Sequence, residues 1–314
     1  MSAYILRRLL ALIPVLLLVS VTVFTIVRVS QGDPSLLLVG EEGNRELASR
    51  IREELGFNRP IPLQYLDWLG HVARGDMGRS MRLPYPVNQL IADKLLITLE
   101  LALLATLVSI AIAIPLGLYA ALRSGGRGET AVTALMAVGV SLPNFWLGIL
   151  LIFAFSVNLR WLPSSGFVSP QQDLLGHLRL LLMPVFTLAL ANAAIFARVF
   201  HAGMAEVLWQ DYIRTARAKG LGQRGVLVGH GLRNALLPLV TAIGVHFGRL
   251  LGGAVVVETI FGIPGLGRLT VEAVTGKDFT VVQAMVLYLT VVTVFSSLIV
   301  DVAYAYLDPR IRYR

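Results

Sequence analysis

Hydrophobic residues in this chain fall into six long blocks. No Asp, Glu, Lys or Arg occurs in residues 9–27, 101–122, 131–157, 180–197, 234–248 and 279–300. A helix needs about 20 apolar residues to cross a hydrocarbon core about 30 Å thick. The pattern predicts an all-α polytopic membrane protein with six transmembrane helices, placed at 9–29, 97–122, 131–157, 180–198, 234–257 and 279–301.

The charged residues between the blocks predict the orientation of the chain. An even number of spans places both termini on one side, together with 123–130, 198–233 and the tail from residue 301. Those segments hold thirteen Lys and Arg against five Asp and Glu, which accounts for the whole formal net charge of +8. Because Lys and Arg in short loops favour the cytoplasmic side, we expect both termini to be cytoplasmic. The basic charge then reflects topology, and no nucleic-acid partner is expected.

The same pattern predicts four parts of the chain. They are a first transmembrane helix at 1–30, an extracytoplasmic region at 31–94, a five-helix core at 95–301 with a cytoplasmic loop at 198–233, and a cytoplasmic tail at 302–314. Two amphipathic helices are expected in the extracytoplasmic region, with apolar stripes at Leu47, Ile51 and Leu55 and at Leu66, Leu69 and Val72. We expect them to lie against the lipid bilayer or to cap the spans.

Polar residues inside the spans are candidates for lining a translocation pathway. Asn144 and Asn192 lie within the third and fourth spans, and His246 and Arg249 share one face of the fifth. Ionisable groups inside a membrane are costly and usually face a cavity or a partner. Asn also joins neighbouring helices by hydrogen bonds without any pathway. The sequence leaves both roles open for the two Asn residues.

Several chemistries are excluded by what the sequence lacks. It has no Cys, and therefore neither a disulfide nor a thiolate metal site. It has no H-E-x-x-H or G-x-S-x-G motif, and its single Gly-Lys pair, Gly276-Lys277, is not in a G-x-x-x-x-G-K-[ST] phosphate loop. We predict no catalytic residue and no cofactor in this chain. His246 has no second ligand at i+3 or i+4, so no metal site is predicted.

Two other transporter classes are weighed against the spans. A secondary transporter needs coupling carboxylates at mid-membrane, whereas Glu100, Glu258 and Asp301 all fall near span ends. A channel is compatible with the spans alone. It leaves the loop 198–233 unexplained, because that loop has the pattern of a helix, a glycine corner and a second short helix.

The strongest motif lies in this loop. DYIRTARAKGL (211–221) and LRNALLP (232–238) resemble the cytoplasmic loop of ABC importer permeases, in the family that carries dipeptides, oligopeptides, nickel and glutathione. The resemblance runs nearly end to end, through YILRRLL (4–10), GDP (32–34), RPIPLQYLDWL (59–69), GDMGRS (75–80), TLEL (98–101), IPLG (114–117), SLPNFWLG (141–148), VVETIFGIPGLG (256–267) and LDPRIR (307–312). The wider superfamily has E-A-A where this chain has Arg214, Thr215 and Ala216, a departure usual for the peptide and nickel branch.

The resemblance implies the type I permease fold of ABC importers, in a bacterial or archaeal cytoplasmic membrane. It implies a heterodimer with a second related permease, two ATPase subunits that bind ATP and Mg, and an extracytoplasmic solute-binding protein. The expected cargo is di- or oligopeptides, with nickel, glutathione or another small solute as alternatives. The residues that would couple to an ATPase are Asp211, Tyr212, Arg214, Thr215, Ala216, Ala218, Lys219, Gly220 and Leu221.

Two hypotheses about loops follow from this resemblance. Ala216 and Gly220 are expected to be small because an ATPase cleft closes on them. The loop GIPGLG at 262–267 has two turn glycines around its proline. We expect it to face the binding protein through Pro264, Gly265, Leu266 and Gly267. The alternative is a re-entrant cap that only packs on the spans.

Overall fold

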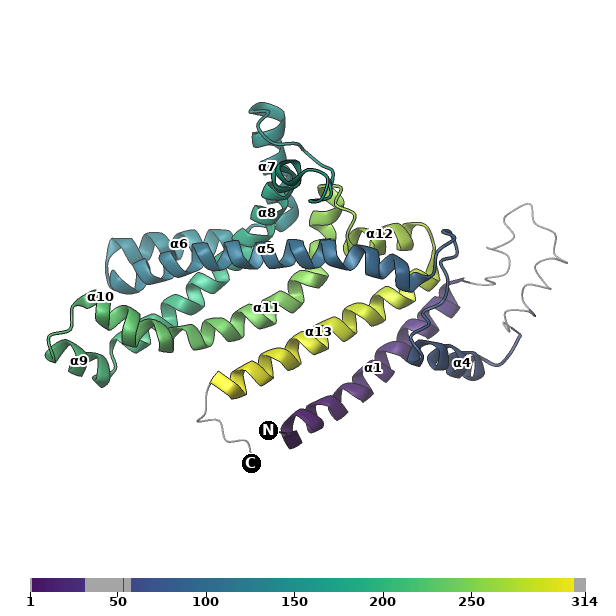
Figure 1. Ribbon diagram of the computed structural model, residues 1–314, viewed down its shortest axis with the longest axis horizontal. Helices are drawn as coiled ribbons and strands as arrows, with labels where there is room; N and C mark the ends of the chain where they lie inside the picture. The colour runs from purple at the N-terminus through teal and green to yellow at the C-terminus, as the bar shows by residue number, and fades with distance from the viewer. Residues whose placement is uncertain (1, 32–52, 54–57, 308–314) are drawn as a thin grey trace. The chain divides into compact units, whose positions relative to one another are not determined.

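The computed structural model describes residues 2–31, 53 and 58–307 (Figure 1). Within these residues the chain is helical, and its one pairing of extended backbone joins Arg79 to Pro86. The predicted amphipathic helix with Leu47, Ile51 and Leu55 lies outside the described residues. So do the last residues of the predicted tail.

The chain divides into two units. The smaller unit comprises Ser2–Leu95 and Leu269–Val291, and the larger one is built on Leu96–Arg268 and the residues from Val292 on. The smaller unit holds α1 (Ser2–Gln31) and α4 (Ile61–Ala73). Three helices contribute to both units: α5 (Val87–Leu122), α12 (Leu266–Thr275) and α13 (Phe279–Leu307). The larger unit adds α6 (Arg127–Ser141), α7 (Asn144–Leu151), the π-helix η1 (Ile152–Asn158), α8 (Leu174–Leu208), α9 (Asp211–Ala218), α10 (Gln223–Val226), the π-helix η2 (Leu227–Gly231) and α11 (Leu232–Ile260).

Five of the six predicted spans are single apolar stretches of helix. They are Leu10–Val29, Val87–Leu122, Leu174–Leu208, Leu227–Leu251 and Phe279–Ser296. The second and fourth are longer than the sequence predicted. The helical class and five of the six spans therefore agree with the hydrophobic pattern.

The third predicted span is two helices rather than one. Its halves, Arg127–Ser141 and Asn144–Asn158, are bent by 98° at the break between them. Pro143 has no N–H to continue the ladder, and it keeps Leu142 extended at φ −78° and ψ 121°. The proline therefore ends α6 and starts α7, whereas the sequence predicted a single transmembrane helix at 131–157.

The core of the larger unit is built around α8, the most buried of the spans. One apolar cluster joins α8 to α5, α6, α9 and the start of α11, and a second joins it to α5 and the end of α11. Gly117 lets α5 approach closely, because a Cβ there would lie 2.8 Å from the carbonyl oxygen of Ala197. Gly248 lets α11 approach α13 closely, because a Cβ there would lie 3.0 Å from the Cβ of Ser296.

In the smaller unit, α4 packs on α1 through aromatic side chains. Tyr65 and Trp68 place their ring centroids 5.5 and 5.4 Å from that of Phe24. The half-buried face of α4 is completed by Leu69 and Val72. The predicted helix is confirmed, and Leu66 of its predicted stripe is 59% exposed and lies outside the face that packs on α1. Tyr65 and Trp68 take the packing face because they, not Leu66, meet Phe24.

Candidate functional site

The helix α9 is fixed to the spans along one side. Ile213 and Ala216 lie three residues apart and are both buried, in the same apolar cluster as Met204 of α8. Val226 and Leu227, from the second short helix, close this cluster from the other direction. The predicted arrangement of a helix, a glycine corner and a second short helix is confirmed.

Gly220 forms the corner after α9. Its φ of +80° lies in the left-handed region, its N–H donates to the carbonyl of Arg217 at 3.0 Å, and the N–H of Leu221 donates to that of Ala216 at 3.4 Å. This is a Schellman motif with glycine at the position that favours it. No atom lies within 4 Å of where a Cβ would stand on Gly220. The backbone conformation therefore selects glycine here, without any crowding inside the chain.

The other side of α9 is exposed, and we call it the α9 surface. Its exposed side chains are Trp209, Asp211, Tyr212, Arg214, Thr215, Arg217, Ala218, Lys219 and Leu221. Trp209 is 74% exposed, an unusual state for so large an apolar side chain. The Tyr212 hydroxyl accepts a 2.9 Å hydrogen bond from Asn234 at the start of α11. An aromatic and apolar surface with three exposed basic residues suits a protein partner with acidic and apolar groups.

The hypothesis for Ala216 changes with this geometry. Its side chain is 6% exposed and faces the chain's own core. Packing between α9 and α8 accounts for its small size, whereas Gly220 remains accessible.

A second site lies around the buried carboxylate of Glu258, near the end of α11. The hydroxyl of Thr98 donates to Oε1 of Glu258 at 2.7 Å, and the backbone N–H of Arg268 donates to Oε2 at 3.0 Å. The backbone N–H of Leu266 donates in turn to the Thr98 hydroxyl at 2.8 Å. The Glu258 carboxylate therefore accepts a hydrogen bond from the backbone that follows α11 and, through the Thr98 hydroxyl, is also linked to α5.

The loop 262–267 is wrapped tightly around this carboxylate. A Cβ on Gly265 would collide with the carboxylate of Glu258, and one on Gly267 would collide with the backbone of Val255. Gly265, Leu266 and Gly267 are buried, while Pro264 is partly exposed. Three of the four loop residues that were expected to face the binding protein therefore point into the protein, and only Pro264 is partly exposed.

The electrostatics of Glu258 reflect two opposing effects. The residue follows the apolar stretch Leu227–Leu251. Burial raises the pKa of its carboxyl group, and the hydrogen bonds from Thr98, Arg268 and Gly267 offset part of that rise. Sequence reasoning treated Glu258 and Thr98 only as parts of motifs near span ends. The only signal in the sequence was a carboxylate placed directly before a loop with two turn glycines. That signal did not identify Thr98 or Arg268 as its hydrogen-bond partners.

The candidate pathway residues occupy different environments. Asn192 is buried, and its side-chain amide donates to the carbonyl of Leu188 in the same helix at 2.9 Å. His246 meets Phe196 of α8 edge to face, with ring centroids 5.7 Å apart. Arg249 is exposed, and Asn144 is the half-buried first residue of α7. The structure thus places His246 against α8 at Phe196, which is one helical turn after Asn192.

A buried histidine joins the loop before α8 to α5. His177 has a 2.8 Å contact between Nε2 and Glu100 Oε1, and a 2.7 Å contact between Nδ1 and the carbonyl oxygen of Val168. A carbonyl oxygen only accepts, so Nδ1 donates, and a second proton must lie between Nε2 and the carboxylate. Nothing in the sequence distinguishes His177 from the other four histidines. In the part of the chain that the structure describes, no three His, Asp or Glu side chains are grouped to hold a metal.

These features define a polytopic helical membrane protein with a short helical element fixed to its spans. Residues 113–313 match the family described as "Binding-protein-dependent transport system inner membrane component". Residues 1–102 match "Binding-prot-dependent transport system membrane comp, N-term". The chain belongs to this family, the membrane-embedded permease components of ABC importers, as its motifs implied.

Relatives and solved structures agree with this assignment. The chain is 43% identical over 313 residues to a putative peptide transport system permease protein of Brucella abortus (strain 2308), covering 100% of both chains. It is 41% identical to the oligopeptide transport system permease protein AppB of Bacillus subtilis (strain 168) and to the glutathione transport system permease protein GsiC of Salmonella choleraesuis (strain SC-B67), again covering 100% of each. An inward-facing structure of the MetNI methionine ABC transporter matches with a TM-score of 0.59 at 18% identity, over 70% of this chain and 97% of that one. The last match shows the shared fold.

Proposed function

We propose that this chain forms half of a translocation pathway for di- and oligopeptides, paired with a second, related permease. Two ATPase subunits bind ATP and Mg and hydrolyse the nucleotide, and a solute-binding protein delivers the cargo. This chain supplies no catalytic residue. Full-length similarity at 39–43% identity to proteins named as peptide permeases supports the cargo.

The α9 surface is the proposed contact with an ATPase. The observation that carries this role is the two-sided character of α9: Ile213 and Ala216 are buried with α8, while the opposite side is exposed. A shift of α9 therefore moves α8 and the start of α11 with it, because close-packed interiors transmit displacement. ATP drives transport only if it favours one arrangement of α9, since a ligand shifts an equilibrium through differential affinity. In this proposal α9 and both termini are cytoplasmic.

The test uses the assembled transporter in proteoliposomes with its binding protein. Gly220→Trp places a large side chain at the exposed corner of α9, and we expect it to abolish peptide uptake and the stimulation of ATPase activity by loaded binding protein. Gly220→Asn is the matched control, because Asn tolerates a positive φ and adds little bulk. We expect Gly220→Asn to retain uptake. Normal coupling in an assembled Gly220→Trp complex would rule out the α9 surface as the contact.

The loop at 262–267 is proposed to meet the binding protein through Pro264, with Glu258 holding it rigid. Partial exposure of Pro264 above a buried network supports this role. A photo-crosslinker at position 264 should capture the binding protein, whereas one at buried position 266 should not. Equal capture from both positions would contradict the proposed geometry.

The cargo is tested by competition. Uptake of a labelled dipeptide into proteoliposomes is measured against unlabelled tetrapeptide, glutathione and Ni²⁺. Glutathione is the second candidate, because relatives from Salmonella are named glutathione permeases. Competition by peptides of different sequence supports a peptide importer, and competition by glutathione alone supports the second candidate. Inhibition by Ni²⁺ alone would overturn both.

A further inference from the structure

The helix α4 has an apolar edge that no described part of the chain covers. Leu63 is 51% exposed and Leu66 is 59% exposed. At 100° per residue they share an edge with exposed Ala73. This edge differs from the face that packs on Phe24.

The contacts of α4 with α1 fix its depth. The hydroxyls of Tyr65 and Ser20 are 2.8 Å apart, and Ser20 itself donates to the carbonyl of Leu17, so Tyr65 is the donor. Ser20 lies nine residues before Val29, the end of the apolar stretch Leu10–Val29. At 1.5 Å per residue this is about 14 Å inside that end, and Phe24 is about 8 Å inside it. Even after allowing for the length of the Tyr65 side chain, α4 lies beside the apolar part of α1.

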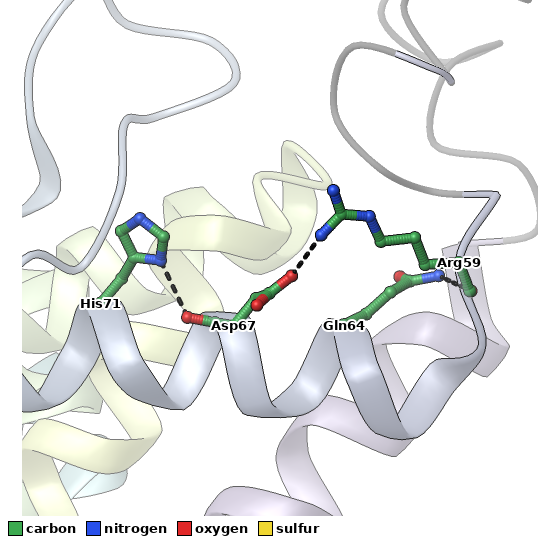
Figure 2. A network of polar contacts seen from close by, with 4 residues as sticks. All are labelled: Arg59, Gln64, Asp67 and His71. Carbon is green, nitrogen blue, oxygen red and sulfur yellow. Dashed lines mark hydrogen bonds and ion pairs between the residues drawn. The ribbon is translucent and has the colours of Figure 1, made fainter.

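The polar residues of α4 flank this apolar edge on one side and hydrogen-bond to neighbouring groups of the same segment. Figure 2 shows Arg59 directed at Asp67, with 2.9 Å between Nη1 and Oδ2. Gln64 donates from Nε2 to the carbonyl of Arg59 at 2.8 Å, and Nδ1 of His71 contacts the carbonyl of Asp67 at 2.8 Å. Paired charges and internal hydrogen bonds reduce the cost of placing polar groups near hydrocarbon.

The first turn of α4 also has few backbone N–H groups that lack a hydrogen-bond acceptor. Pro60 and Pro62 carry no N–H, and the N–H groups of Leu63 and Gln64 both donate to the carbonyl of Pro60. A helix start normally exposes four unpaired N–H groups. This start is suited to a medium without water.

We propose that α4 is an interfacial membrane helix. Its edge of Leu63, Leu66 and Ala73 inserts among the acyl chains of the leaflet around the C-terminal end of α1, and its polar edge faces the headgroups. The occupant is lipid because α4 packs, through Phe24 and Ser20, beside the apolar stretch of α1, a span that itself lies in the membrane. The segment between the first two spans is thereby anchored to the bilayer.

The experiment uses single cysteines, since the chain has none of its own. Leu66→Cys and His71→Cys are labelled with bimane in the assembled transporter, whose partner subunits have no accessible thiol, in phosphatidylcholine vesicles. Doxyl-phosphatidylcholine should quench the label at 66 several-fold more than that at 71, and aqueous iodide should show the reverse order. Leu63→Cys should repeat the pattern and serves if Leu66→Cys fails to assemble.

Two results would overturn the inference. Iodide quenching at 66 equal to that at 71 would place the edge in water, and protection of 66 from both quenchers would show that another protein subunit covers it. Peptide uptake measured on the same vesicles separates this result from the proposed function. Quenching of position 66 by lipid without peptide uptake would support the membrane position of α4 and contradict the proposed peptide cargo. Peptide uptake with quenching of position 66 by iodide would support the cargo and contradict the membrane position.

Discussion

The hydroxyl of Thr98 donates a 2.7 Å hydrogen bond to the carboxylate of Glu258, joining residues 160 positions apart. Both groups are fully buried. Because the same hydroxyl accepts from the N–H of Leu266, the pair links α5 and α11 to the first residue of α12. The loop at 262–267 is therefore organised by a polar centre within the larger unit.

Removal of this carboxylate should destabilise the protein. Glu258→Ala leaves the Thr98 hydroxyl and the Arg268 N–H without their acceptor, and each orphaned buried group costs about 1–3 kcal/mol. We expect a lower Tm of the purified complex and increased proteolysis at the loop. Glu206→Ala is the control, because that side chain is exposed on α8. Equal stability of the two variants would show that the network contributes nothing.

The stability contributed by Glu258 should depend on pH. Its pKa in the folded protein is raised above the ordinary value of 4.5, so the folded state holds the proton more tightly than the unfolded chain does. This contribution is complete below about pH 4.5 and is lost as the pH rises through the folded-state pKa. We therefore expect the Tm of the native protein, relative to Glu258→Gln, to fall as the pH rises over that range. A difference that grows with pH would contradict the sign.

The sequence predicted the spans well because a membrane helix is defined by local composition. The 98° break arises locally at Pro143, but composition does not distinguish a broken span from a continuous one. The pairing of Thr98 with Glu258 depends on packing between distant residues, which spacing does not show. On α4 the sequence has two apolar edges, and local periodicity does not tell which one meets Phe24. For that reason the predicted stripe combined exposed Leu66 with Leu69 and Val72, which lie on the half-buried face.

Two alanines in α9 should respond differently to the same change. Ala216 is buried against α8, so Ala216→Leu overpacks the cluster and should cost about 1–3 kcal/mol of unfolding free energy. Ala218 is exposed in the same helix, and Ala218→Leu should leave the Tm unchanged. Thermal unfolding of the complex without nucleotide measures stability apart from coupling. A Tm unchanged by Ala216→Leu would show that its small size serves something other than packing.

The contact between His177 and residue 100 should require a side chain at position 100 that donates a proton to Nε2, and should not require a charged carboxylate there. Nδ1 of His177 donates to Val168, so a neutral ring presents a lone pair at Nε2. Glu100→Gln supplies an amide N–H to that lone pair and should retain the native Tm. Glu100→Ala leaves buried Nε2 without its partner, and we expect a loss of about 1–3 kcal/mol. Thermal unfolding of the purified complex ranks the three proteins. Equal instability of Glu100→Gln and Glu100→Ala would contradict this prediction. It would show that the buried ring needs a charged carboxylate at position 100, that is, an ion pair between imidazolium and carboxylate.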